Sequence, residues 1–328
     1  MSTVATGAAR AERSAVCLPP APVQNITLQR YYSDRNGTQV DAARLTAYRA
    51  ETAALTSFLR EVSRFADRSW QASTVGARET AAHCGLRWLV TWADGGAYLG
   101  QMSSKQAEYQ RKWDLAGLSL AYLKLRRHAN ASTHAVVIRW LGEIADRAER
   151  FQMAPGRKPN NHLYWLALGM SAQALAADDD LRWRRARELV RFAARQIADD
   201  GTLPLELARG RRALHYHTFS AMPLIAAAEL AHSRGEDWYA FAGGALHRLV
   251  AVTVAGLVEP PLFDRIASVQ QVRPVTPRAG WLFLYARRHP RRGIPPTFQK
   301  KRRHRLLGGD VRVLLAALRP GGRNDDAR

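Results

Sequence analysis

The sequence has few cysteines and no long apolar run. Only two of its 328 residues are cysteine, and two cysteines by themselves establish no disulfide framework. No uninterrupted apolar run approaches the roughly 18 residues that cross a bilayer, so a membrane-spanning protein is not expected. The opening residues, MSTVATGAARAERSAVC, lack the apolar stretch of a signal peptide, and this N-terminus therefore does not support export.

Acidic residues are also scarce. The chain has 28 Asp and Glu against 49 Lys and Arg, which gives a formal net charge of +21 and a pI near 11.0. This balance favours a polyanionic partner, such as a nucleic acid, an anionic membrane surface or an acidic polysaccharide. The densest basic run, residues 287–305, has nine Lys and Arg and no acid. Such a run is typical of a nucleic-acid or targeting patch, and equally of a solvated arginine-rich surface.

Helical periodicity, by contrast, runs through most of the chain. With 47% hydrophobic residues, the protein can bury a large core as one large domain or two ordinary ones. Apolar residues recur at three- and four-residue spacing, whereas few segments alternate as strands do. The pattern predicts an all-α chain of antiparallel helical hairpins, a toroid or solenoid whose helix ends and loops build a cleft. The expected helices are residues 45–70, 81–100, 104–128, 133–153, 162–176, 181–200, 219–235 and 238–257.

Residues 160–170, NNHLYWLALGM, place two amides and an imidazole directly before an apolar helix. Asn is a favoured helix N-cap, so Asn160 or Asn161 has a structural interpretation as the cap and His162 as a packed surface side chain. The same three side chains also lie at a helix N-terminus, where the helix dipole favours an anion. Both interpretations are open on this segment alone.

Two further segments carry side chains suited to a charged sugar. Residues 200–224, DGTLPLELARGRRALHYHTFSAMPL, are expected to form a loop rich in Arg and His followed by a helix. In residues 106–116, QAEYQRKWDLA, three side chains share one helical face and can present hydrogen bonds and an aromatic platform to a sugar. These are Gln106, Tyr109 and Trp113, with Arg111 beside them. An ordinary core stripe with a basic outer side explains the second pattern equally well.

Taken in order, these motifs resemble those of the alginate lyases of polysaccharide lyase family five. The resemblance rests on NNHxYW, DGxLPxEL followed by RGxRALxYH, RKWxLA, WADGGA at 92–97 and LGGDVR at 307–312, from about Cys17 to about Arg312. It implies an incomplete (α/α) toroid with a substrate cleft, as a single lyase domain over residues 17–318 between disordered segments at 1–16 and 319–328. It also implies β-elimination on a uronic-acid polymer without a metal or other cofactor. A monomer that binds anionic polysaccharide, with no specific nucleic acid and no membrane partner, is expected.

The resemblance assigns catalytic roles that fit this chemistry. Elimination removes the C5 proton of a uronate while the C4 glycosidic oxygen leaves, and that proton is too weakly acidic unless the neighbouring carboxylate is neutralised. Asn161 and His162 can hydrogen-bond the carboxylate, and Arg209 can add a full positive charge.

Tyr216 corresponds to the family's catalytic tyrosine. A phenol has an ordinary pKa of about 10, and Arg209 is expected to lower it so that the tyrosine can act as a base. In a mannuronate-type substrate the C5 proton and the C4 oxygen lie on one side of the ring, so one phenolate can take the first proton and return it to the second. His162 is the alternative base when the proton lies on the opposite face.

Three further family features concern the periphery of the site and the compartment. Residues 28–37, LQRYYSDRNG, resemble a mobile lid with Arg30 and Tyr31, although Tyr31 and Tyr32 compete for the aromatic position. Asp310 falls where the family has a cleft aspartate, or it is a helix N-cap. Cys17 and Cys84 lie at positions resembling a family disulfide, which would fit a periplasmic enzyme. Two explanations are open for the missing signal peptide: the true start codon lies upstream and supplies the signal, or the protein is a cytoplasmic outlier with reduced thiols. The first is favoured.

The expected function is cleavage of alginate, most readily of polymannuronate. The nearest competing function is that of a lyase of the same mechanism that acts on polyglucuronate or another uronan. A degenerate lyase that binds uronan without cutting it and a non-catalytic basic helical protein that binds polyanions are two further candidates. A nucleic-acid-binding module would give no reason for Asn161, His162, Arg209 and Tyr216 to occur in the family's order.

Overall fold

The computed structural model describes residues 17–34, 36–272 and 280–319. Within them the prediction of an all-α chain is confirmed, and both strands are only two residues long. The segments predicted to be disordered, 1–16 and all but the first residue of 319–328, lie outside the described residues. The longer helices are α2 (Ala42–Glu51), α3 (Ala53–Gln71), α4 (Val75–Asp94), α5 (Lys105–Leu125), α6 (Ala131–Met153), α7 (Asn161–Ala177), α8 (Asp180–Arg195), α10 (Ala213–Ser233), α11 (Phe241–Val258) and α13 (Gly280–Arg288). The short elements are α9 (Pro204–Leu207), α12 (Pro260–Ile266), α14 (Pro296–Gln299), α15 (Val311–Ala317), β1 (Arg303–His304) and β2 (Gly309–Asp310).

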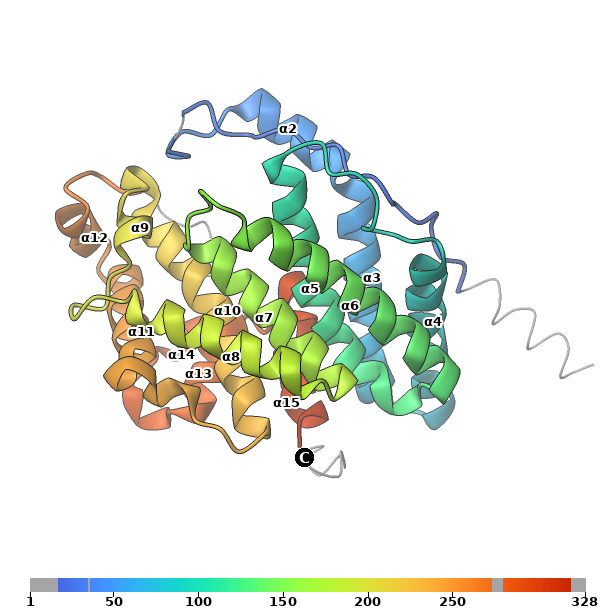
Figure 1. The fold of residues 1–328 in the computed structure, drawn as a ribbon. Helices are drawn as coiled ribbons and strands as arrows, with labels where there is room; N and C mark the ends of the chain where they lie inside the picture. Colours follow the sequence, from blue (N-terminus) through green and yellow to red (C-terminus); the bar gives the residue numbers. More distant parts are fainter. Residues whose placement is uncertain (1–16, 35, 273–279, 320–328) are drawn as a thin grey trace, which may run out of the picture.

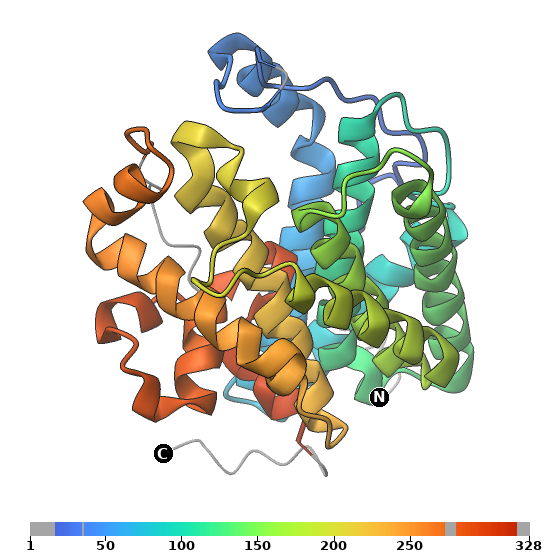
Figure 2. The ribbon, with the colours of Figure 1, turned by 60° about the vertical axis from the view of Figure 1, so that its left-hand side comes forward.

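The helices form an incomplete (α/α) toroid in which inner helices are wrapped by outer ones (Figure 1, Figure 2). The inner helices α5, α7 and α10 pack side by side and are buried on nearly all sides, because α7 and α10 are apolar around their whole circumference. The outer helices α3, α6 and α8 each bury one apolar face and turn arginines outward. The polar ends of the inner helices therefore have to be satisfied inside the protein, and one such end forms the site described below.

Two expected helix boundaries are wrong in ways that matter for the site. The single helix expected over 45–70 is divided at Thr52, so α2 forms a separate helix with no buried residue. In Figure 1, α2 and the segment before it lie across one end of the toroid. The helix expected to begin at residue 219 begins at Ala213, so Tyr216 lies in the first turn of α10 and not on the preceding loop. A buried helix fixes the direction of this side chain more firmly than a loop would.

One described segment, Trp238–Val258, is long and apolar enough to cross a membrane, an exception to the sequence expectation. Ala242, Gly243 and Gly244 inside it have left-handed backbone angles that break the helix. The regular part, residues 245–258, is about 21 Å long at 1.5 Å per residue, short of the roughly 30 Å hydrocarbon core of a bilayer. It packs on α10 and α8, as a core helix does.

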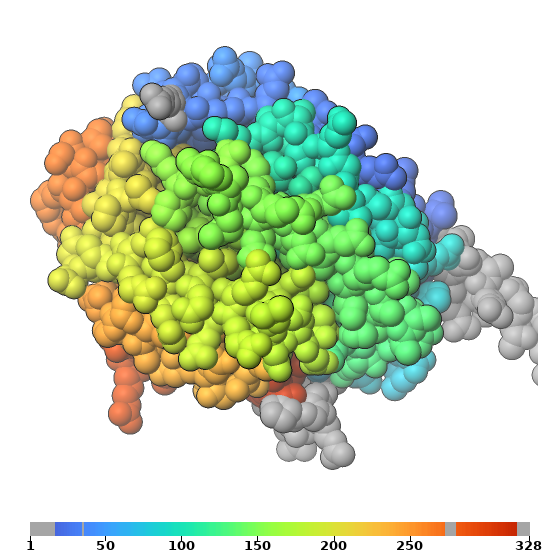
Figure 3. Space-filling view, viewed as in Figure 1, coloured from blue at the N-terminus to red at the C-terminus, as the bar shows by residue number. Residues whose placement is uncertain are grey.

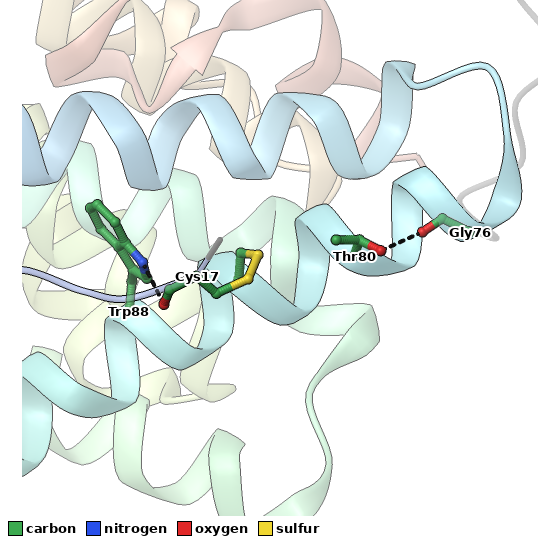
Figure 4. The surroundings of a disulfide bond; sticks show 5 residues. Cys17, Gly76, Thr80 and Trp88 are labelled. Atoms are coloured by element: carbon green, nitrogen blue, oxygen red, sulfur yellow. Dashed lines mark hydrogen bonds between the residues drawn. A yellow bond between two sulfur atoms is a disulfide. The ribbon is translucent and has the colours of Figure 1, made fainter. Parts of the chain in front are cut away.

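A disulfide fixes the start of the described chain. Cys17 and Cys84 are bonded and buried, and the Trp88 indole N–H donates to the Cys17 carbonyl at 3.1 Å (Figure 4). The two cysteines are 67 residues apart, so the bond removes about 4 kcal/mol of chain entropy from the unfolded state. From this anchor the chain runs along α4, where Pro20 accepts from the Trp92 indole at 2.9 Å, and on to the segment before α2. The bond therefore determines where that segment starts.

Near the C-terminal end of α5, a buried lysine joins the C-terminal elements to the toroid. The Lys124 ammonium donates to Asp67 at 2.7 Å and to the carbonyls of Gly308 and Asp310 at 2.6 and 3.1 Å. Asp67 also accepts the Asp310 backbone N–H at 2.9 Å. Lys124 and Asp67 are almost completely buried, so each charge depends on the other. The network holds β2 and α15 against α3 and α5.

We expect Asp67→Ala to lower the free energy of unfolding by about 3–5 kcal/mol, because it leaves the buried Lys124 charge without its partner. Urea denaturation followed by circular dichroism measures the loss. Glu188→Ala is the control, since it removes a surface ion pair with Arg191 whose side chains are 60% and 37% exposed. That change is expected to cost less than about 1 kcal/mol. Equal effects of the two substitutions would contradict the buried-pair interpretation.

Candidate active site

The N-terminal segment closes over the end of the toroid where α7 and α10 begin. We call residues 28–34 and 36–41 the lid; it continues into α2 and forms part of the upper surface in Figure 3. The Tyr32 hydroxyl lies 2.7 Å from that of Tyr216, and both side chains are buried. The Gly37 carbonyl accepts from the Arg209 guanidinium at 3.2 Å. Gly37 has a φ of +68°, and a Cβ there would lie 2.4 Å from Arg209 Nη2, so glycine allows this close approach.

Asn161 is held by a buried carboxylate. Glu206, at the end of the DGTLPLE segment, accepts the Asn161 backbone N–H at 2.8 Å and its side-chain Nδ2 at 2.9 Å through one oxygen. Both residues are fully buried. Burial raises the pKa of Glu206, and the two hydrogen bonds from Asn161 lower it. Asn160 is the N-cap of α7, its side chain accepting from the His162 N–H at 3.2 Å, so Asn161 is not needed as the cap.

His162 lies in an aromatic stack built by α5. Its ring stacks on Tyr109 at 3.5 Å between centroids and lies 5.9 Å from Trp113. Its Nδ1 is buried and has no hydrogen-bond partner among the described residues. Burial holds the pKa of His162 well below its ordinary value, and Lys112 and Arg209 lower it further. The imidazole is therefore neutral, and it reaches the site as a hydrogen-bonding group rather than as a cation.

Arg209 joins the parts of the site. Its guanidinium carbon lies 3.6 Å from the centroid of the Tyr216 ring, and its charge also acts on His162 and Glu206. Arg212 lies 5.9 Å from the same ring. Neither arginine forms an ion pair with a carboxylate in the part of the chain that the structure describes. The site therefore has two guanidinium groups that no carboxylate of the described residues contacts as an ion pair.

The expectation of a lowered tyrosine pKa is wrong for this closed arrangement. The pKa of Tyr216 is raised to about 12, because burial disfavours the phenolate more than the nearby cations favour it. Arg209 and Arg212 lower this pKa, as does the hydrogen bond with Tyr32. Tyr216 is therefore a neutral phenol when the lid is closed.

Of the other residues expected to bind substrate, some lie at the site and one points away from it. Tyr109 and Trp113 lie at the site, and Gln106 is buried one turn before Tyr109 on α5. Arg111 points away from the site, since it pairs with Glu108 at 3.1 Å and donates to the Gly100 carbonyl. On the lid, the Tyr31 ring packs at a tilt against the rings of Tyr32 and Tyr48, with centroids 4.5 and 4.9 Å apart.

Asp310 does not lie at the cleft. It is the N-cap of α15, accepting from the Arg312 N–H at 2.9 Å, and it belongs to the Lys124 network at the C-terminal end of α5. In Figure 1, α15 and α2 lie at opposite ends of the toroid. The N-cap interpretation is therefore the one that the structure supports.

Glu206 escaped the sequence prediction, and Tyr32 entered it only as the competitor of Tyr31. Glu206 lies inside the quoted segment DGTLPLEL, but a carboxylate among so many cations is typical of a surface ion pair. Tyr32 competed with Tyr31, and the structure places the Tyr32 hydroxyl on Tyr216. In the described part of the chain, no group of three or more His, Cys, Asp or Glu could hold a metal ion. The metal-free reaction remains a prediction.

The arrangement defines a class of protein. A helical toroid whose inner helix ends present a phenol, an imidazole and an amide, with a guanidinium from the loop after α9 over the phenol, has the groups that a polysaccharide lyase needs to neutralise a uronate and move its proton.

Comparison with known proteins identifies the family. The sequence model of the family described as alginate lyase matches residues 25–263. A polysaccharide lyase of Stenotrophomonas maltophilia is 38% identical over 87% of this chain and 86% of its own length. An alginate lyase of Azotobacter vinelandii is 33% identical over 70% of this chain and 65% of its own length, just under two thirds of that protein. The chain belongs to the alginate lyase family.

Solved structures agree on the fold. Alginate lyase A1-III of Sphingomonas species A1 superposes with a TM-score of 0.76, covering 90% of this chain and 85% of that chain at 23% identity. A histidine-to-alanine variant of the same enzyme, complexed with a tetrasaccharide, superposes with a TM-score of 0.79. The (α/α) toroid predicted from the sequence is thereby confirmed.

Glu206→Ala is expected to lower kcat by about tenfold or more, because the Asn161 amide loses the acceptor that fixes its orientation, and a preorganised donor is worth up to about 3 kcal/mol. Glu206→Gln keeps a carbonyl oxygen at the same place and is expected to recover most of the activity. Steady-state kinetics on alginate, with circular dichroism to check folding, measures both. Wild-type kcat in a folded Glu206→Ala protein would show that Asn161 needs no such support.

Proposed function

We propose that this lyase cleaves mannuronate-rich alginate by β-elimination, with Tyr216 as both base and acid. The observation that carries the proposal is the position of Arg209, stacked on Tyr216 and close enough to act on His162 and Glu206. A uronate whose carboxylate lies against Arg209 would reach Tyr216 on one side and the Asn161–His162 pair on the other. The relatives named alginate lyase support the choice of polymer.

In the proposed reaction the carboxylate of the sugar is neutralised first. Arg209 supplies a full charge, and Asn161 and His162 supply hydrogen bonds at the N-terminus of α7, where the helix dipole adds to them. The Trp113 indole N–H is buried without an acceptor among the described residues, which supports a sugar oxygen as its partner. Neutralising the carboxylate makes the C5 proton acidic enough to be removed.

Proton transfer then passes through one hydroxyl. The Tyr216 phenolate takes the C5 proton, and the electron pair of that C–H bond forms the C4–C5 double bond. The C4–O bond breaks, and the glycosidic oxygen takes the proton back from Tyr216. Arg209 and Arg212 lower the pKa of Tyr216 against the effect of burial, so they help to form the phenolate. His162 is the alternative base for a sugar whose C5 proton lies on the other face.

Substrate preference follows from ring geometry. Mannuronate and glucuronate both place C5 hydrogen and C4 oxygen so that a single group can serve both, and they differ only at C2. Guluronate has the opposite configuration at C5, which moves the proton away from the leaving oxygen. A lyase for polyglucuronate or another uronan is therefore the second candidate.

The proposed setting is the periplasm, with the protein acting as a monomer and without a cofactor. The Cys17–Cys84 bond supports an oxidising compartment. A nucleic-acid role for residues 287–305 is less well supported, because Arg288, Arg303 and Arg305 are each within ion-pair distance of carboxylates in this structure.

Tyr216→Phe is expected to abolish product formation while alginate still binds, because the ring under Arg209 remains and only the proton-transferring oxygen is lost. Ultraviolet absorbance of the unsaturated uronate measures turnover, and calorimetry measures binding. Tyr32→Phe is the matched control, since it removes the other hydroxyl of the same hydrogen bond. Its cost is expected to be about fivefold, the value of one neutral hydrogen bond. Turnover by Tyr216→Phe within a few-fold of wild type would reject the assignment.

We expect polymannuronate to be cleaved fastest, polyglucuronate second and polyguluronate least, with binding of all three weakened by added salt, because a chain of +21 charge releases counter-ions from a polyanion. Each polymer and duplex DNA are titrated in parallel, with cleavage followed by absorbance. Salt dependence does not distinguish a uronan from DNA as the partner, so competition between these polymers for the protein is used to distinguish them. DNA that blocks cleavage at the cleft, or the absence of an unsaturated product from every uronan, would favour the polyanion-binding protein over the lyase.

A further inference from the structure

His217 is a buried histidine that the proposed reaction does not use. It follows Tyr216 on α10 and has no exposed surface. Its Nε2 lies 2.9 Å from the backbone nitrogen of Leu203, and its Nδ1 lies 2.8 Å from the carbonyl oxygen of Ala213. From α12, Phe263 makes a T-shaped contact with the ring, with centroids 4.9 Å apart. Both ring nitrogens are occupied, so His217 is neither a base nor a ligand for the sugar.

The two partners fix the tautomer of this ring. A backbone N–H can only donate, so Nε2 has to accept from Leu203 with its lone pair. A carbonyl oxygen can only accept, so Nδ1 has to carry the proton that it donates to Ala213. The imidazole is therefore neutral. Burial lowers the pKa of His217 to about 4, although the bond to Ala213 and the charge of Asp200 raise it, which agrees with a neutral ring.

Leu203 connects His217 to the site. It is the N-cap residue of α9, and its carbonyl accepts the Glu206 N–H at 2.9 Å. The Glu206 carboxylate holds Asn161, and the Glu206 carbonyl accepts the Arg209 N–H at 3.1 Å. A single turn of backbone therefore links the His217 ring to the amide and the guanidinium that are proposed to neutralise the uronate.

The loop before Leu203 fits closely between α10 and α11. On the side of α11, Gly201 has a φ of +85°, and a Cβ there would lie 2.3 Å from the Arg248 carbonyl oxygen. On the side of α10, His217 accepts the Leu203 N–H. A backbone N–H that is buried without a partner is costly, so this bond favours one position of the loop on α10.

We propose that His217 is a positioning residue that holds the loop of Glu206 and Arg209 in place for the reaction. The phenol that is proposed to move the proton lies on α10, whereas the groups proposed to neutralise the carboxylate lie at the start of α7 and after α9. His217 joins these parts, because it is the residue next to Tyr216 and accepts from the loop. The inference rests on the proposed function, in which these groups act on one sugar.

The test compares two substitutions that each keep one of the two hydrogen bonds. In His217→Gln the side-chain oxygen reaches the position of Nε2 and accepts from Leu203. In His217→Asn the shorter amide can still donate to Ala213 but does not reach Leu203. We expect kcat on polymannuronate to fall about ten- to hundredfold in His217→Asn, as small displacements of catalytic groups do, with a smaller change in KM. His217→Gln is expected to stay within about threefold of wild type, because the neutral hydrogen bond is kept.

His247→Asn is the matched control. His247 is half-buried on α11, and its Nδ1 lies 2.8 Å from the Tyr285 hydroxyl. The same change of side chain is made there without touching the loop, so kcat is expected to equal that of wild type. If His217→Asn does not fold, His217→Met takes its place, because it matches Gln in length and lacks a strong acceptor.

Two measurements without substrate test the hydrogen bond itself. Nitrogen-15 NMR of histidine-labelled wild type is expected to show the His217 proton on Nδ1, with the signal assigned by its loss in His217→Gln. The Leu203 amide is expected to exchange slowly with deuterium in wild type and in His217→Gln, and faster in His217→Asn.

A wild-type ring with its proton on Nε2 would overturn the proposal. Wild-type kcat in folded His217→Asn, or equal losses of kcat in the Asn and Gln variants, would assign His217 to core packing alone and overturn it as well. So would the failure of every His217 variant to fold. A protein with the expected tautomer and amide exchange that cleaves no uronan would count against the proposed function and not against the contact of His217 with Leu203.

Discussion

The hydrogen bonds between Glu206 and Asn161 are the constraint on which the site depends. The first N–H groups of a helix have no partner within the helix, and α7 begins inside the protein where water does not supply one. Glu206 accepts one of these N–H groups and the neighbouring side-chain amide with the same oxygen. A buried carboxylate in turn requires donors, and Asn161 supplies two of them to one oxygen of Glu206. His162 follows Asn161 directly, and Arg209 follows Glu206 by three residues, so this junction places both.

The excess of basic residues has more than one use in the folded protein. Arg288, Arg303 and Arg305 come from the densest basic run, and they reach Glu229, Asp67 and Asp114 across the helices. Lys124 joins the C-terminal elements to the toroid. Arg209 and Arg212 are different, because no carboxylate of the described residues pairs with them, and they lie over the Tyr216 ring instead. The net charge therefore indicated the kind of partner but not the location of its binding site.

In the lid, a shift of one residue in the sequence alignment changes the role assigned to a side chain. Tyr31 and Tyr32 are neighbours of the same type, and their ring centroids lie 4.5 Å apart. Tyr32 reaches Tyr216, whereas Tyr31 packs between Tyr32 and Tyr48. The lid's path depends on the Cys17–Cys84 bond and on contacts of Gly37 with Arg209, all of which join residues distant in the chain. No local pattern contains that information.

The sequence by itself determined the helical class, because apolar residues at three- and four-residue spacing leave no other regular structure that buries them. It also predicted which motifs carry the chemistry, since NNH and the YH pair, with Arg209, lie in ordered motifs that resemble one family. Only the tertiary structure decided that Asp310 caps a helix far from the cleft, that Arg111 faces Glu108, and that burial raises the pKa of Tyr216 by more than Arg209 lowers it. The burial of Tyr216 depends on contacts between helices that are far apart in the sequence. The partners of Arg111 and Asp310 are local, and what the fold adds for them is which parts of α5 and α15 lie away from the site.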